Sequence, residues 1–293
     1  ETVMKGAEMM RDFEPDLIVA MGGGSPIDAA KAMWIFYEYP NFTFEQAVIP
    51  FGLPELRQKA KFVAIPSTSG TATEVTAFSV ITDYKAKIKY PLADFNLTPD
   101  IAIVDPDLAQ TMPAKLVAHT GMDALTHAIE GYITKGAWEM SDMFHIKAIE
   151  IISKSLRGAV ENTPEGREGM ALGQYVAGMG FSNVGLGLVH SMAHPLGALY
   201  DTPHGVANAI ILPTVMEYNA PYTGEKYKDI AEAMGVDTTG MSQEEYRKAA
   251  VDAVKQLSKD VGIPADLKEI VKEEDLQFLS ESALADACCP GNP

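Results

Sequence analysis

Five side chains that could bind a metal fall within two stretches of the sequence. Asp123 and His127 lie four residues apart, as do His190 and His194, and His204 follows them. Residues four apart share one face of a helix, so each pair can direct two side chains toward one point. One carboxylate with several imidazoles is a ligand set for iron, zinc or manganese, and a metal with an open position can polarise a substrate oxygen. The spacing alone leaves open which of the five stays off the metal.

Three consecutive glycines form a candidate phosphate-binding loop. Gly22 to Gly24 follow an apolar run at 16–21 and precede a predicted helix, with Ser25 as its N-cap and Asp28 as the acid of a capping box. Backbone N–H groups at such a helix N-terminus can bind an anion. The motif is neither Gly-x-Gly-x-x-Gly nor a Walker loop, so a purely structural turn is an equal alternative.

Hydroxyl side chains follow a second apolar run. The run at 61–65 leads into a loop over 66–76 that is rich in serine and threonine. Hydroxyls at the carboxyl ends of parallel strands can bind a dinucleotide, although serine and threonine also favour capped turns. Lys89 is a further candidate for a ribose hydroxyl or a phosphate. The alternative is a solvated lysine in a run with Lys85 and Lys87.

The elements that must position these groups change in character along the chain. Apolar runs at 16–21, 61–65 and 101–104 alternate with helical patterns, which predicts a parallel sheet with helices on both faces. Helical periods dominate afterwards, and we predict an α/β dinucleotide-binding domain over 1–108 and an all-helical metal-binding domain over 109–293. We interpret His119 and His145 as ordinary core or surface residues. A helix that begins at Pro113 is predicted to break at Thr120-Gly121, and His204 is predicted to lie on a loop. Further helices are predicted at 122–132, 141–160, 164–183, 206–218, 225–234 and 242–261.

Composition narrows the class of protein. The net charge of −17 disfavours nucleic acid and anionic membranes as partners, because both bind clustered basic residues. No apolar run reaches the length of about 18 residues expected of a membrane span, and no signal-peptide pattern opens the sequence. The two cysteines, Cys288 and Cys289, are adjacent and form no disulfide framework, which favours a reducing, cytoplasmic setting.

Four segments together resemble the iron-containing (group III) alcohol dehydrogenase family over essentially the whole chain. They are Gly22-Gly-Gly-Ser-Pro-x-Asp28, the 66–76 loop, Gly121-Met-Asp-Ala-Leu-Thr-His-Ala-Ile-Glu-Gly-Tyr132, and His190-Ser-Met-Ala-His-Pro-Leu-Gly197 with Pro203-His-Gly205. Within the family, residues 131–234 are most similar to the lactaldehyde-reducing members, and the first hundred residues to ethanol and butanol dehydrogenases. The resemblance implies an incomplete Rossmann-like parallel-sheet domain followed by an all-helical, dehydroquinate-synthase-like metal domain.

The resemblance also implies a role for each candidate residue. Asp123, His127, His190 and His204 would hold Fe²⁺, with Zn²⁺ as the alternative metal, and His194 would assist proton transfer beside the substrate and the nicotinamide. The expected activity is metal-dependent, NAD(P)-linked interconversion of a small primary alcohol or diol and its aldehyde, by a homodimer or larger homo-oligomer. The residues implied to line the cofactor site are Gly23, Gly24, Ser25, Ser67, Thr68, Thr71, Thr76, Val80 and Lys89.

The ends of the sequence depart from the family pattern. The family has further βα elements before the position of Glu1, including the acidic residue that contacts the adenosine ribose, and a last helix after Pro293. We therefore expect a partial chain in which NAD is the assumed cofactor and NADP stays open. Two alternative functions remain. One is a non-redox, dehydroquinate-synthase-like lyase, which the sequence of residues 121–204 disfavours, and the other is a truncated, inactive chain that binds nucleotide.

Overall fold

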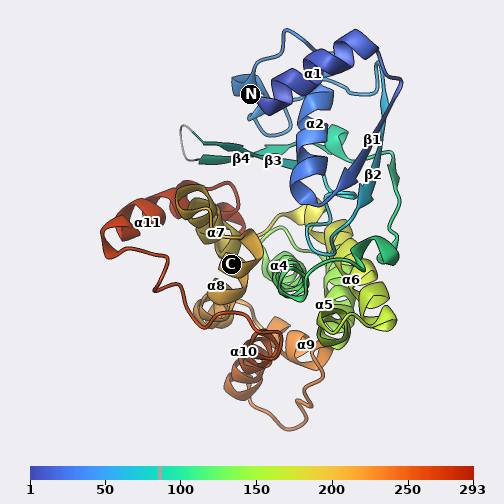
Figure 1. The fold of residues 1–293 in the computed structure, drawn as a ribbon. Coiled ribbons are helices and arrows are strands. Elements are labelled where there is room, and N and C mark those ends of the chain that lie inside the picture. The colour runs from blue at the N-terminus through green and yellow to red at the C-terminus, as the bar shows by residue number, and fades with distance from the viewer. Residues whose placement is uncertain (85–87) are drawn as a thin grey trace.

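The chain is divided between an α/β half and a helical half. A computed structural model describes residues 1–84 and 88–293, so Lys85 and Lys87 lie outside the described residues. The α/β half lies at the top of Figure 1 and the helical half below it. Within the described ranges, no helix combines the length and apolarity needed to cross a membrane. The predicted domain limits at 108 and 109 remain a prediction.

A three-stranded parallel sheet brings both candidate loops together at the carboxyl ends of its strands. Its order is β1-β2-β5, with β1 at Leu17–Gly22, β2 at Lys61–Pro66 and β5 at Ile101–Ala102 (Figure 1). Gly22 pairs with Pro66 in the parallel register, so the chain leaves both strands on the same side. The glycine loop and the serine- and threonine-rich loop therefore lie next to each other.

Helices cover one face of this sheet. Helix α2, Gly24–Glu38, packs on β1, and α1, Thr2–Phe13, packs on α2, while α3, Phe44–Ala47, is a single capped turn. The core between them holds Ile27, Trp34, Ile35, Phe36 and Phe62. The apolar runs had predicted burial of both faces, but the opposite face is exposed in the described chain at Leu17, Val19, Met21, Ile101 and Ile103.

An antiparallel hairpin that the sequence did not predict follows the second loop. Strand β3, Phe78–Asp83, pairs with β4, Ile88–Ala93, and most side chains of both strands are only partly buried. Mixed polar content and Pro91 hide the pattern of an ordinary strand. The hairpin matters because it places Val80 and Lys89 over the loops.

The helical half has its own core. That core includes Met122, Leu125, Ile149, Leu156 and Leu212. The helices are α4 (Ala114–Ile133), α5 (Glu139–Val160), α6 (Pro164–Val184), α7 (Leu188–Tyr200), α8 (His204–Asn219), α9 (Lys226–Ala233), α10 (Gln243–Asp260) and α11 (Leu276–Ala285).

Four local predictions are wrong. Helix α4 does not break at Gly121, because an added Cβ would lie 2.2 Å from Leu156 Cδ1 and the glycine serves close packing instead. His204 is the first residue of α8, not part of a loop. Helix α2 has Gly23, not Ser25, at its N-cap, and Asp28 makes no capping box. In addition, helix α11 was absent from the predicted elements.

Candidate active site

Helix α4 carries two of the candidate ligands on one face. Asp123 and His127 occupy successive turns, and Glu130 follows three residues after His127 on the same face. All three side chains are buried. The helix can hold them rigidly because it is buried continuously from Gly121 to Ile133.

Helices α7 and α8 bring histidines to the same point. His190 lies in the first turn of α7 and His204 opens α8. Their Nε2 atoms lie 3.8 Å and 3.7 Å from Asp123 Oδ1, and the ligand atoms of all three residues lie within 4.8 Å of one another. The structure thus brings together three of the four predicted metal ligands.

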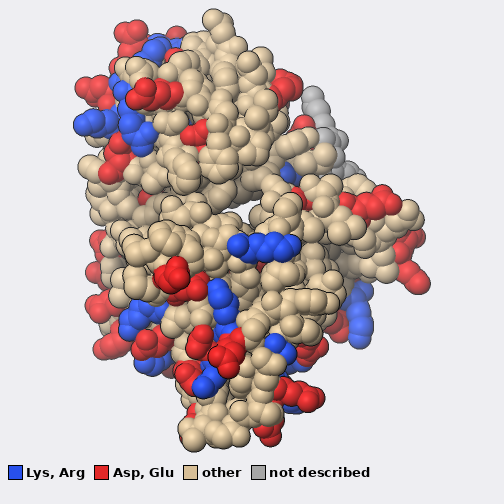
Figure 2. Space-filling model, turned by 180° about the vertical axis from the view of Figure 1, so that it is seen from behind, with Lys and Arg blue, Asp and Glu red and all other residues tan. Residues whose placement is uncertain are grey.

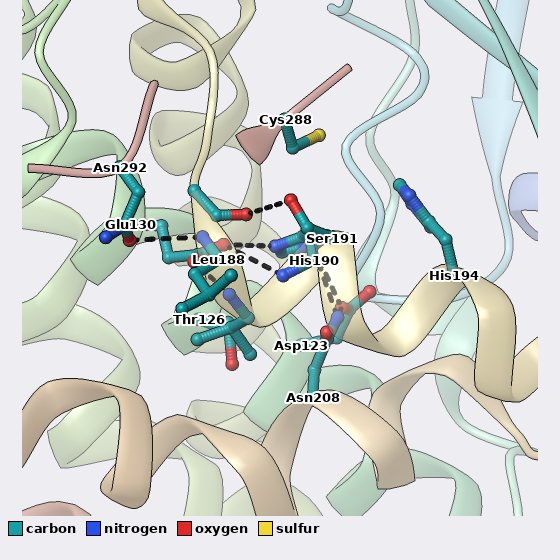
Figure 3. Close-up of polar contacts among 12 residues, drawn as sticks. Asp123, Thr126, Glu130, Leu188, His190, Ser191, His194, Asn208, Cys288 and Asn292 are labelled. Atoms are coloured by element: carbon teal, nitrogen blue, oxygen red, sulfur yellow. Dashed lines mark hydrogen bonds and ion pairs between the residues drawn. The ribbon is translucent and has the colours of Figure 1, made fainter. Parts of the chain in front are cut away.

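The amide of Asn208 marks the point on which these three atoms converge. Its Nδ2 donates to Asp123 Oδ1 over 2.6 Å and lies 3.2 Å from His190 Nε2 (Figure 3). It lies 3.2 Å from His204 Nε2 as well. A carboxylate and two imidazole nitrogens aimed at one electropositive group form a donor set that fits a divalent transition metal. The residues present therefore fit the metal implied by the sequence.

His127 lies beside this group but outside it. Its ring stacks on that of His190, with the centroids 4.6 Å apart, and on Phe181 at 4.3 Å. Its Nδ1 is buried and has no hydrogen-bond partner in the described structure. The fourth predicted ligand, His127, is therefore adjacent to the group formed by Asp123, His190 and His204 but is not part of it.

Burial keeps the converging imidazoles neutral. The pKa of His190 is held well below its ordinary value, first by burial and then by His127 and His194. Burial likewise lowers the pKa of His204, against the opposing effect of Asp123. Neutral imidazole is the form that binds a metal.

His194 has a different partner. Its Nδ1 lies 2.7 Å from Asp286 Oδ2, in the segment that follows α11, and its ring stacks on His204 with centroids 5.5 Å apart. Cys288 lies next to this pair, and its backbone N–H donates to Asp286 Oδ1. The hydrogen bond to Asp286 leaves Nε2 as the free ring nitrogen of His194.

A cavity of about 430 Å³ joins the histidines to the two loops. Figure 2 shows a hollow on the back of the molecule between its upper and lower parts. The predicted cofactor residues that line the cavity are Gly24, Ser25, Thr71, Thr76, Val80 and Lys89, and the predicted metal and catalytic residues that line it are Asp123, His127, His190, His194 and His204.

The other three predicted cofactor residues, Gly23, Ser67 and Thr68, are not among the residues that line the cavity. Ser67 donates its backbone N–H to Gly22 O over 2.8 Å, and Gly23 faces Thr68, whose Cγ2 would lie 3.2 Å from an added Cβ. The glycines thus let the two loops approach closely.

Lys89 is half-buried on the hairpin and not freely solvated. Burial lowers the pKa of its ammonium, and Asp123 and Asp201 oppose that shift. Its Nζ lies close over Gly197 of α7, where an added Cβ would be 2.8 Å away. Lys89 therefore reaches from the α/β half to the helix that carries His190 and His194.

Comparison with known proteins decides the family. Residues 1–106 match the iron-containing alcohol dehydrogenase model, and residues 117–293 match the C-terminal model of the Fe-containing alcohol dehydrogenase family. The chain belongs to the iron-containing alcohol dehydrogenase family. The fold class, an α/β parallel-sheet half followed by a helical half, is confirmed by solved structures of this family.

Several relatives of this iron-containing alcohol dehydrogenase have names that specify a substrate. An NADPH-dependent butanol dehydrogenase of Clostridium saccharobutylicum is 56% identical over 100% of this chain and 76% of its own length. Lactaldehyde reductase of Escherichia coli K12 is 53% identical, covering 99% and 76%. The crystal structure of a 1,3-propanediol oxidoreductase matches with a TM-score of 0.94 and 42% identity, covering 99% and 76%.

The roles of four polar residues of this dehydrogenase site were not predicted from the sequence. Glu130 and Asp286 bind the Nδ1 atoms of His190 and His194, Asn208 lies among the ligands, and Asp28 accepts hydrogen bonds from Thr73 and Val80. Glu130 could have been found, since it continues the face of Asp123 and His127. Asn208 lies four residues after His204 on α8, so the same spacing would have found it once His204 was placed on a helix. Asp286 and Asp28 meet their partners only through the tertiary fold.

Proposed function

We propose that this chain is a metal-dependent, NAD(P)-linked dehydrogenase that interconverts a small primary alcohol or diol and its aldehyde. The observation that carries the proposal is the single cavity in which Asp123, His190 and His204 converge opposite the glycine and threonine loops. The names of the relatives support butanol, lactaldehyde or 1,3-propanediol as the substrate type, and 1,2-propanediol is the diol that reduction of lactaldehyde gives.

We assign the metal site to Asp123, His127, His190 and His204, with Fe²⁺ as the metal and Zn²⁺ as the alternative. The bound metal would supply a Lewis acid for the alcohol oxygen, and the nicotinamide would exchange the hydride. His127 stacks on His190 beside the other three and would complete the set.

We assign proton transfer to His194. Asp286 fixes its Nδ1, so Nε2 is the nitrogen that takes the proton from the alcohol and returns it to the aldehyde in reverse. The ring lines the cavity and stacks on His204, which keeps it beside the proposed metal site.

We assign the cofactor to the wall formed by Gly24, Ser25, Thr71, Thr76, Val80 and Lys89, with Gly23, Ser67 and Thr68 shaping the loops. NAD is the proposed cofactor, although one relative is named as NADPH-dependent. The cofactor part would span 1–108 and the metal part 109–293, in a cytoplasmic homodimer or larger homo-oligomer.

Two alanine variants test these assignments. His190→Ala is expected to lose bound metal and activity together, whereas His194→Ala keeps the metal and lowers turnover by about 10²- to 10⁴-fold, the range of general acid–base catalysis. Metal content of the purified proteins and NAD(P)H absorbance with butanol or 1,2-propanediol measure both. Equal metal content and equal activity in the two variants would contradict the roles.

The wild-type protein discriminates the rival functions. Net formation of NAD(P)H from alcohol supports a dehydrogenase, whereas a lyase that uses the nucleotide only transiently gives none. A chain that binds nucleotide but no metal would be an inactive relative.

A further inference from the structure

The carboxylate of Glu130 is buried and makes three hydrogen bonds to one helix start. It is 2% exposed. Its Oε1 accepts from Val189 N over 2.6 Å, and its Oε2 accepts from His190 N over 3.3 Å and from His190 Nδ1 over 2.6 Å (Figure 3). A side chain of α4 thus holds both the backbone and the imidazole of a residue on α7.

Helix α7 has no cap of its own. Its N-cap is Gly187, which offers no side chain, and the first N–H groups of a helix have no partner within it. Glu130 accepts two of them, those of Val189 and His190. Among the described residues, the only ion-pair partner of Glu130 is His190.

We propose that Glu130 is a positioning residue that sets the orientation and tautomer of His190 for metal binding. The inference rests on the proposed function, because it takes His190 as a ligand. With Nδ1–H donated to Glu130, the lone pair of His190 is fixed on Nε2, the atom that faces Asp123 and His204. A carboxylate behind a ligating imidazole also raises the basicity of the ligand.

The substitution Glu130→Gln removes this arrangement with little change in shape. A carboxamide has one accepting oxygen, so its NH₂ group must face the N–H of Val189 or the Nδ1–H of His190. Either a buried donor loses its acceptor or His190 loses its fixed tautomer. Glu130→Asp keeps the carboxyl group but withdraws it by one methylene group, and serves as a second variant.

Glu38 provides a matched control. It is also a buried carboxylate that accepts backbone N–H groups, from Gln58, Lys59 and Ala60 at 3.0 to 3.1 Å, but it lies on α2 in the α/β half. Glu38→Gln therefore imposes a similar loss of buried hydrogen bonds without touching a candidate ligand.

The experiment titrates Co²⁺ into metal-free full-length chain and records its visible absorption bands, with unfolding measured in parallel. We expect Glu130→Gln to weaken Co²⁺ binding by about 10- to 100-fold, as loss of an outer carboxylate typically does, and Glu130→Asp to weaken it less. Glu38→Gln should keep the wild-type affinity although it lowers stability.

Wild-type Co²⁺ affinity in both Glu130 variants would overturn the inference, as would an equal loss in Glu38→Gln. If Glu130→Gln does not fold, Glu130→Asp decides. A wild-type chain that binds Co²⁺ but oxidises no alcohol contradicts the proposed function alone, since this titration needs no turnover. A wild-type chain that binds no Co²⁺ overturns both.

Discussion

At the scale of residues, the fold keeps one histidine far from its ordinary protonation behaviour. His145 is fully buried in α5, and an added Cβ at Gly131 or Gly180 would lie 2.2 Å or 2.4 Å from its Nε2. Neither ring nitrogen has a hydrogen-bond partner in the described structure. Burial, with Lys226 and His127, lowers its pKa to about 3.

This histidine should make stability depend on pH. Below about pH 6.5, His145 binds a proton in the unfolded chain but stays neutral in the folded chain. The free energy of unfolding therefore falls as the pH drops from 6.5 toward 3. The loss is at most about 1.4 kcal/mol per pH unit from this group. His145→Leu should show a flatter decline between pH 6.5 and 4, measured by urea unfolding.

The difference in the free energy of unfolding between the wild type and His145→Leu isolates the effect of His145, because the metal ligands and surface carboxylates titrate in both proteins. At pH 8, where His145 is neutral in the folded and unfolded states, the difference reports only packing. A difference that stays constant from pH 8 to pH 4 would show that His145 takes up its proton normally.

The sequence predicted helical pairs at this scale but not which imidazole does what. Spacing placed Asp123 with His127 and His190 with His194 on helices, as the structure has them. The carboxylates that distinguish the two α7 histidines lie 60 and 92 residues away in the chain. Only the tertiary fold brings such distant residues together, so local spacing could not assign the roles.

At the scale of elements, α5 and α6 approach so closely that backbone meets backbone. An added Cβ at Gly166 would lie 2.2 Å from Ala159 N and 2.3 Å from Gly158 C. Both helices were predictable from the sequence because their apolar residues recur with a helical period. The β3–β4 hairpin and α11 were not, because their sequences lack a clear period.

Gly166→Ala should therefore destabilise the protein by about 3 kcal/mol, the upper range of overpacking, because a backbone cannot turn aside as a side chain can. Gly6→Ala in α1 is the control. Its added Cβ would meet Met33 Sδ at 2.4 Å, the end of a flexible side chain, and alanine favours a helix. Urea midpoints compare them, and an equal or smaller loss in Gly166→Ala would contradict this account.

At the scale of the whole molecule, the proposed metal site joins three helices that are far apart in the sequence. Asp123 lies on α4, His190 on α7 and His204 on α8, and α8 packs against both α4 and α7 (Figure 1). The sheet and α1 contribute no candidate ligand. Metal binding should therefore stabilise one half of the chain more than the other.

Removing the metal by chelation should increase amide hydrogen exchange in α4, α7 and α8 and leave β1, β2 and α1 nearly unchanged. Binding energy protects only those openings that release the ligand, by about 2.7 kcal/mol when the metal is at 100 times its Kd. Glu130 lies between α4 and α7, so the first turn of α7 should lose the most protection. Mass spectrometry of exchanged peptides from metal-loaded and stripped protein measures this. Equal deprotection of β1 and α7 would mean that the two halves open as one unit and that the metal stabilises the fold as a whole.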